Sequence, residues 1–535
     1  MSLAMALLIS VIVGLAYLGR RIGGDPQLER PIVIAPIVGL LLGDLEAGVR
    51  IGGAFELIFI GAAPIGGAVP PNVAVSSALG AAFAISAGGG VQEALLIGVP
   101  AAVVATSFEA LAKGGCSYLV HPVDRFAKLG NRRDIIGTIW VGNAVHFLAY
   151  AIPTFLALYF GRGLVESLSN LVSGSVEDAL TVAAAILPAL GFGLLLSILT
   201  TRVLFPLFIV GFLLASYTDL GVIGVALLGA AIIIFIQTSR GTTEADSEPV
   251  EGESESVGGV PDYAETTLSR RDIRSLFWRS FLLQAAFNYE RFQNLGWWWG
   301  FRKLLDRWYS HQGDLLPQAY QRHLVFFNTH PWVSTIVYGI VATMESRKAA
   351  GEEIDDDAIQ GIKVGTMGPL AGIGDSLFFG AIRPIVSGLC ASLAVVGNFL
   401  APILFLVGIN IIHFASRWYG LQYAFRYGQR VFERLGGTQL ERVRESAVMV
   451  GLLVVGALVA TLLPITTPLE YTVGDAQIVL QDFLDEILVG LIPLTITLVV
   501  FWLVRKGLNP LYILIALTIV GLAGGYFGLL SGPEL

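Results

Sequence analysis

The sequence predicts an all-α polytopic membrane protein with two related helical bundles that contain broken or re-entrant helices. Of its 535 residues, 55% are hydrophobic and 14% are charged, whereas a soluble domain carries about 25% charged residues. The mean hydropathy is +0.72, and apolar stretches recur along most of the chain. The 63 glycines agree with this class, because small residues let membrane helices approach each other closely.

Residues 1–237 are expected to form a first membrane domain. Its first apolar segment has no basic residues ahead of it, which favours a retained helix over a secretory signal. Several later segments are too short to cross about 30 Å of hydrocarbon as one straight helix of roughly 20 residues. The expected apolar segments are 3–18, 32–44, 51–66, 73–88, 94–112, 136–160, 179–200, 203–215 and 218–237.

Residues 238–267 differ abruptly from both flanks. They are rich in Ser, Glu, Gly and Pro, and Ser239 to Thr267 contains no apolar run. Such a composition cannot bury enough surface to offset the entropy of ordering the chain. We therefore expect a disordered acidic linker that joins two polypeptides.

Residues 268–535 form the expected second domain, with an amphipathic part at 268–322 and a membrane part at 323–535. Ser269 and Asp272 have the spacing of a helix start. Basic residues mixed with Phe and Trp indicate helices in the membrane interface, on the cytoplasmic side together with the linker. The aromatics fit interfacial anchoring better than nucleic-acid binding, which is not expected. Further spans are expected near 324–343, 361–382, 385–415, 445–464, 482–504 and 510–530.

The run from Gly365 to Ser376 places a carboxylate among glycines inside an apolar segment. A break there would leave backbone groups unpaired, which lipid does not tolerate, so the break would line a cavity. Asp375 is then a candidate functional residue. The alternative is a cluster of packing glycines with an Asp that reaches the interface. Gly52 to Asn72 is a similar segment in the first domain, and the two are candidates for a pseudo-symmetric binding site.

Polar residues near the first segment are candidate substrate ligands. Glu56 could accept hydroxyl groups or take part in ion coupling, or else satisfy backbone amides at a helix end. Asn72 follows two prolines and offers both a donor and an acceptor. Asp25 and Gln27 precede another apolar segment, where a solvated loop is an equal alternative.

The second domain adds Asn328, Thr329 and Ser376 as candidates. Asn328 and Thr329 precede Pro331, so an ordinary helix N-cap is a strong alternative to a role in the cavity. Arg383 lies about two helical turns beyond Asp375, and it is a candidate partner for that carboxylate or another inside the bundle.

Carboxylate, carboxamide and hydroxyl groups together suit a neutral, polyhydroxylated ligand. The chain has no glycine-rich phosphate loop and no Cys/His cluster, so no cofactor, metal site or catalytic residue is expected. The six histidines are interpreted as structural.

At these motifs the sequence resembles the mannose-type (mannose–fructose–sorbose) family of the bacterial phosphoenolpyruvate-dependent sugar phosphotransferase system. Residues 1–237 look like its IIC subunit, through Arg30-Pro31, Leu42-Gly-Asp44, Gly52-Gly53, Glu56 and the bend from Gly66 to Asn72. Residues 268–533 look like its IID subunit, through Phe327-Asn-Thr-His-Pro331, the run from Gly365 to Ser376, and Arg383-Pro384.

The resemblance implies a fused IIC–IID permease of the inner cell membrane that moves a hexose of the mannose, fructose, glucosamine or sorbose type. A soluble IIB partner, loaded by IIA, would transfer a phosphoryl group from its phosphohistidine to the sugar, and the complex would be a trimer. The enzymatic histidine is thus expected on the partner and not on this chain. An ion-coupled secondary sugar transporter is the alternative.

Overall fold

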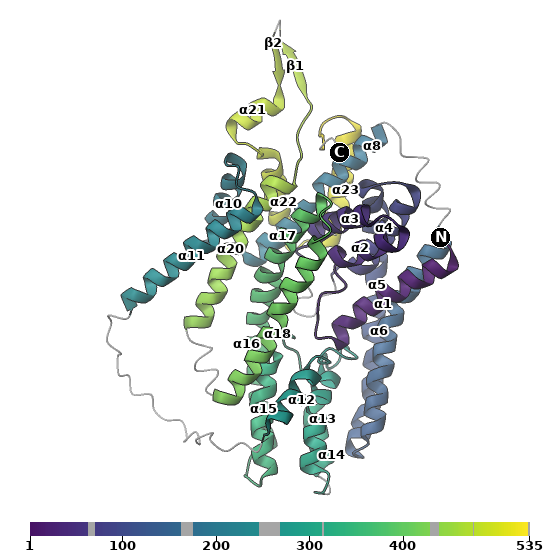
Figure 1. Cartoon of the computed structure of the whole chain (residues 1–535), viewed down its shortest axis with the longest axis vertical. Coiled ribbons are helices and arrows are strands. Elements are labelled where there is room, and N and C mark those ends of the chain that lie inside the picture. The colour runs from purple at the N-terminus through teal and green to yellow at the C-terminus, as the bar shows by residue number, and fades with distance from the viewer. Residues whose placement is uncertain are drawn as a thin grey trace.

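The computed structural model describes residues 1–62, 70–161, 175–244, 268–312, 315–427, 438–473 and 476–532. The described chain is almost entirely helical and elongated, with a short β-hairpin at one end and α14 at the other (Figure 1). Within these ranges, seven helical segments are long and apolar enough to cross a membrane, and a bent pair, 480–487 with 491–505, makes up to eight. The expectation of an all-α multi-pass membrane protein is therefore confirmed.

The first domain contains ten described helices, one of which is much longer than the sequence suggested. This helix, α5, extends well beyond the apolar segment at 94–112, and its second half packs on the amphipathic part of the second domain through Val120, Val123 and Ala127. The described helices are α1 (Leu3–Ile22), α2 (Pro31–Leu42), α3 (Leu45–Ile58), α4 (Val73–Ala87), α5 (Val91–Lys128), α6 (Arg132–Phe160), α8 (Ser175–Ile186), α9 (Pro188–Leu199), α10 (Phe205–Tyr217) and α11 (Val222–Glu244).

The second domain begins with the helix start that the sequence predicted. The Ser269 hydroxyl accepts from the Asp272 amide at 3.3 Å, and the Asp272 carboxylate accepts from the Ser269 amide at 2.9 Å. The described elements are α12 (Arg270–Ser280), α13 (Asn294–Tyr309), α14 (Leu315–His323), α15 (Ser334–Ala349), α16 (Asp356–Gly374), the π-helix η2 (Asp375–Ile382), α17 (Arg383–Val395), α18 (Ala401–Tyr427), α20 (Thr438–Leu462), β1 (Glu470–Val473), β2 (Ala476–Val479), α21 (Leu480–Ile487), α22 (Leu491–Arg505) and α23 (Pro510–Tyr526).

The hairpin of β1 and β2 was not predicted. Its strands pair antiparallel, with Glu470 opposite Val479. The range 482–504 was expected to be one membrane span, but α21 and α22 meet there at a bend of 70°. The hairpin, α21 and the bend that follows it lie together at the end of the molecule opposite α14 (Figure 1).

The two domains are interleaved and do not pack as separate bundles. Helices α3, α8, α9 and α10 of the first domain contact α17, α23, α22 and α20 of the second, respectively. A Cβ atom on Gly211 of α10 would overlap the backbone of Leu453, and one on Gly456 of α20 would overlap that of Phe208. Such close approach of backbones is the way small residues hold membrane helices together. The domains therefore share one apolar core.

The residues predicted to be a linker begin inside a helix. Helix α11 continues to Glu244, so residues 238–244 are helical, and 245–267 lie outside the described residues.

The run from Gly365 to Ser376 is not the backbone break that the sequence suggested. Helix α16 continues through Pro369 to Gly374, η2 follows directly, and residues 356–395 form one apolar span. A helix pairs its own backbone groups, and an apolar environment enforces that solution even across glycines. The irregularity appears instead as the π-helix, a form that is frequent at functional sites.

Candidate functional site

The helix break that was expected in the first domain is present. Helix α3 ends at Ile58 and α4 begins at Val73; the described residues between them, 59–62 and 70–72, are not helical, while 63–69 lie outside the described residues. The carbonyls freed by this break are bound by two arginines. Arg30 Nη2 donates to Phe59 O at 3.2 Å, and Arg383 Nη2 donates to Ala62 O at 3.1 Å and Ile60 O at 3.4 Å.

Arg30 also forms a fully buried ion pair with Glu56. Its Nη2 and Nε lie 2.5 Å and 3.0 Å from Glu56 Oε1, and the Ile32 amide donates to Oε2 at 3.5 Å. Both side chains are at most 3% exposed. Glu56 therefore holds Arg30 in place at the break.

A polar cavity lies beside the break, between the two domains. Its volume is about 30 Å³, which is room for a water molecule or two. Both domains line it: Arg20, Gln27, Glu29, Arg30, Ala62, Pro70, Pro71, Asn72, Val73, Ala74, Glu109 and Tyr150 come from the first, and Phe379 and Arg383 from the second. Of the predicted ligands, the structure brings Gln27 and Asn72 to this cavity.

Four polar groups in the cavity wall are buried without a hydrogen-bond partner: Arg20 Nε, Glu29 Oε2, Asn72 Nδ2 and Arg383 Nε. The first, third and fourth are donors, and the second is an acceptor. Burial of such groups without partners is costly, so a ligand that supplies hydrogen bonds is favoured here.

The loop before α2 is buried, and the solvated alternative for Asp25 and Gln27 is wrong. Gln27 Nε2 donates to Asp25 Oδ1 at 2.7 Å, and both residues have positive φ angles, 63° and 75°. Residues of the second domain hold this loop. Trp332 Nε1 donates to Asp25 O at 3.3 Å, and Arg417 Nη2 donates to Gly24 O at 3.2 Å. A strained backbone persists when surrounding contacts determine it, as they do here.

Sequence reasoning missed Glu109, which forms one wall of the cavity. Its carboxylate accepts from Tyr150 OH at 2.6 Å and Tyr17 OH at 3.2 Å, and Lys113 Nζ lies 2.9 Å away. A Glu and a Lys four residues apart in a membrane span are a recognisable signal of function. Arg20, Glu29 and Tyr150 were also missed; they carry no comparable motif.

Four predicted ligands in the second domain do not line the cavity. Thr329 exchanges backbone hydrogen bonds with the Gln293 side chain and donates its hydroxyl to Met367 O at 3.0 Å. Ser376 Oγ donates to Ile373 O at 3.1 Å. Asn328 and Asp375 are half-buried. Arg383, the candidate partner of Asp375 or of another carboxylate, donates to Ile60 O and Ala62 O.

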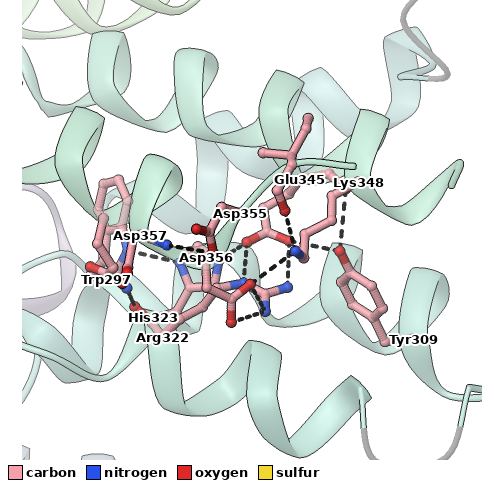
Figure 2. Close-up of polar contacts among 11 residues, drawn as sticks. Trp297, Tyr309, Arg322, His323, Glu345, Lys348, Asp355, Asp356 and Asp357 are labelled. Carbon is pink, nitrogen blue, oxygen red and sulfur yellow. Dashed lines mark hydrogen bonds and ion pairs between the residues drawn. The ribbon is translucent and has the colours of Figure 1, made fainter. Parts of the chain in front are cut away.

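A second buried polar cluster joins α13, α14, α15 and the start of α16 (Figure 2). Glu345 accepts from Arg322 Nε at 2.6 Å, from Tyr309 OH at 2.9 Å and from His323 Nε2 at 2.9 Å. Arg322 Nη1 also donates to Asp356 at 3.1 Å. In contrast to the cavity, this cluster has a partner for every group named here, which indicates a structural role.

The charges in this cluster shift its pKa values. Burial alone would raise the pKa of Glu345, but the hydrogen bonds and charges of His323 and Arg322 outweigh it and hold that pKa well below its usual range. Burial lowers the pKa of His323 despite the adjacent carboxylate. Because Trp297 Nε1 donates to its Nδ1 at 3.1 Å, the neutral ring carries its proton on Nε2, facing Glu345.

A broken helix and a polar cavity enclosed by two interleaved membrane domains are features of a membrane permease. Residues 3–235 match the family described as "PTS system sorbose-specific iic component", and residues 267–530 match "PTS system mannose/fructose/sorbose family IID component". The chain belongs to the mannose/fructose/sorbose family of the sugar phosphotransferase system (PTS) as a fused IIC–IID protein, and it is a PTS sugar permease.

Two relatives, one of each part, agree with this assignment. The chain is 40% identical to the mannose-specific EIID component of Escherichia coli K12 over 273 residues, 50% of this chain and 96% of the relative. It is 26% identical to the fructose permease IIC component of Bacillus subtilis 168 over 237 residues, 44% of this chain and 87% of the relative. A solved structure titled "Structure of membrane protein" is 39% identical and covers 50% of this chain and 99% of that one, with a TM-score of 0.48. The ion-coupled alternative has no support among these relatives.

Proposed function

We propose that the permease binds a hexose in the cavity between its domains. The observation that carries the proposal is the convergence on one cavity of four buried atoms without a hydrogen-bond partner: Arg20 Nε, Glu29 Oε2, Asn72 Nδ2 and Arg383 Nε. Sugar hydroxyls donate and accept at once, so a hexose can satisfy guanidinium, carboxamide and carboxylate groups together. The relatives named for mannose, fructose and sorbose support this class of ligand.

The roles proposed for the predicted ligands differ. Gln27 and Asn72 are direct partners of the sugar, Asp25 orients Gln27, and Glu56 acts by holding Arg30. A cavity of about 30 Å³ is too small for a hexose, so binding requires the walls to move apart.

In this proposal, the predicted sugar ligands of the second domain contact the sugar only in a more open state of the permease. When α16 and η2 shift relative to α3, Asp375, Ser376, Asn328 and Thr329 become available to the sugar. The outcome is alternating access by an elevator-like or rocking motion, with the two domains as the moving parts.

The product is trapped by phosphorylation on the cytoplasmic side in this mechanism. A soluble IIB protein, loaded by IIA, donates the phosphoryl group, and its negative charge makes return through the sugar site costly. The distribution of Lys and Arg supports a cytoplasmic position for α12 to α14. Residues 445–504, which include the β-hairpin, contain no Lys or Arg, whereas 268–322 contain nine. Basic segments favour the cytoplasm, so α12 to α14 are proposed to face IIB. We further propose a trimer of the fused chain.

Transport by proteoliposomes tests the function. Purified protein is reconstituted, radiolabelled mannose, fructose, glucosamine or sorbose is added on one side, and phosphorylated IIA and IIB are supplied on the other. We expect the label to appear as sugar phosphate for at least one hexose, and only with the soluble partners present. Accumulation of unmodified sugar, driven by an ion gradient without the partners, would refute the proposal.

A further inference from the structure

Two arginines pack against one tryptophan ring where α6, α12 and α13 meet. The guanidinium carbons of Arg279 and Arg302 lie 4.6 Å and 5.1 Å from the centre of the Trp299 ring. Trp299 meets the Trp140 ring of α6 edge to face at 6.5 Å. Helices α12 and α13 contact each other, and α13 contacts α6, in the part of the molecule away from the β-hairpin (Figure 1). These residues take no part in the sugar cavity.

These two arginines lack a close ion-pair partner among the described residues. Neither arginine has an ion pair within 4.0 Å there, although other arginines of this region do: Arg291 with Asp124 and Arg307 with Asp272, both at 2.6 Å. The acid that acts on Arg279 from a greater distance is Asp306, which already binds Arg132 Nη1 at 3.3 Å and the Tyr320 hydroxyl.

Three donors of the pair are buried and have no acceptor: Arg279 Nε, Arg279 Nη2 and Arg302 Nε. Burial, and then the like charge of Arg302, lower the pKa of Arg279 to about 10, so its guanidinium group is charged at neutral pH. Two neighbouring cations with unmet donors form an arrangement that an anion would stabilise, because it supplies the missing acceptors and removes the repulsion.

We propose that Arg279 and Arg302 bind a phosphate group, and that an anionic phospholipid supplies it. Guanidinium forks match phosphate oxygens in geometry as well as in charge. Trp140 is 47% exposed on α6, which is a candidate membrane span, so this edge of the cluster is placed next to lipid. Tryptophan and arginine are side chains that gather at the level of lipid headgroups.

Lipid binding by matched variants tests this proposal. Native mass spectrometry of the full chain in detergent measures binding of phosphatidylglycerol and of phosphatidylcholine. Substitution by methionine removes the donors and keeps an unbranched stem against Trp299, so the variant is Arg279→Met with Arg302→Met. Lys303→Met is the control, since Lys303 is the next residue, is exposed and carries the same charge.

We expect wild type to prefer phosphatidylglycerol, and the double variant to bind it at least about tenfold more weakly, as loss of charge-assisted hydrogen bonds implies. The control should stay within about twofold of wild type. Without lipid, the double variant should melt no lower than wild type, because repulsion is relieved. If it melts lower, Arg302→Lys, which keeps the charge but loses the fork, should still bind phosphatidylglycerol more weakly than wild type.

Equal binding of phosphatidylglycerol by wild type and the double variant would overturn the proposal. So would equal affinity of wild type for the two lipids. A third arm adds millimolar inorganic phosphate to lipid-free protein and records the melting temperature. Phosphate could stabilise wild type but not the double variant, while wild type shows no preference for phosphatidylglycerol. That result would overturn the lipid as the source of the phosphate group and keep the phosphate site.

Discussion

Asn72 separates sugar binding from helix stability, because its side chain has two ends with different tasks. Its Oδ1 caps α4 by accepting from the Val75 amide at 3.1 Å, while its Nδ2 is buried at the cavity without a partner. Serine can accept the same amide hydrogen bond as an N-cap but has no group in place of Nδ2. Asn72→Ser should therefore keep the fold and weaken the sugar complex.

The size of the effect follows from one hydrogen bond. A neutral hydrogen bond contributes about 0.5–1.5 kcal/mol, which corresponds to a roughly 2- to 13-fold rise in the Kd for the sugar. Asn72→Ala should weaken sugar binding as much and should also lose the cap, at a cost of about 1 kcal/mol in stability.

Equilibrium binding of radiolabelled sugar and thermal unfolding in detergent measure the two effects separately. Asn131→Ser is the matched control, because Asn131 caps α6 by the same contact, to the Asp134 amide at 3.4 Å, and does not line the cavity. If Asn72→Ser bound sugar as tightly as wild type, Nδ2 would not be a sugar donor and the assignment of this cavity would fail.

Three further predictions concern stability and the contact between domains. Glu345→Ala leaves Arg322 buried with one partner fewer and should cost about 3–5 kcal/mol in thermal unfolding, whereas Glu352→Ala, at an exposed pair, should change little. Folding depresses the pKa of Glu345, so the ionised carboxylate stabilises the fold above the ordinary pKa near 4.5, and this stabilisation is lost as the pH falls below that value. Glu345→Ala should therefore flatten the acid side of a curve of stability against pH. Gly53→Ala places a Cβ 2.8 Å from α17 of the other domain, so it should lower stability by about 1–3 kcal/mol and reduce transport. The control Gly365→Ala has open space around it and should be tolerated. Equal effects of the two substitutions would contradict the packing.

The helix break in the first domain was predictable, whereas the groups that stabilise it were not. Glycines and prolines in an apolar segment that also contains Glu56 indicate irregular backbone at membrane depth. The side chain that binds Ala62 O is Arg383, which is 321 residues away. No periodicity or local motif connects such residues, so only the packed structure could show the contact.

The reverse holds for the glycine-rich run that ends at Ser376. Its local composition suggested a break, but its surroundings let α16 and η2 remain helical, and Asp375 does not line the cavity. Local propensity is a weak guide where an apolar environment requires every backbone group to be paired.

The sequence by itself determined the class of protein and the family, because hydropathy, composition and short motifs are local properties. It also indicated Asn72, in the broken segment, and Gln27, ahead of another apolar segment, as candidate ligands. The tertiary structure alone decided that the domains interleave, that Glu109 and Arg383 meet across one cavity, and that Glu56 is occupied by Arg30. Those outcomes depend on which faces of distant helices pack together, and that is settled by the sum of many contacts across the shared core.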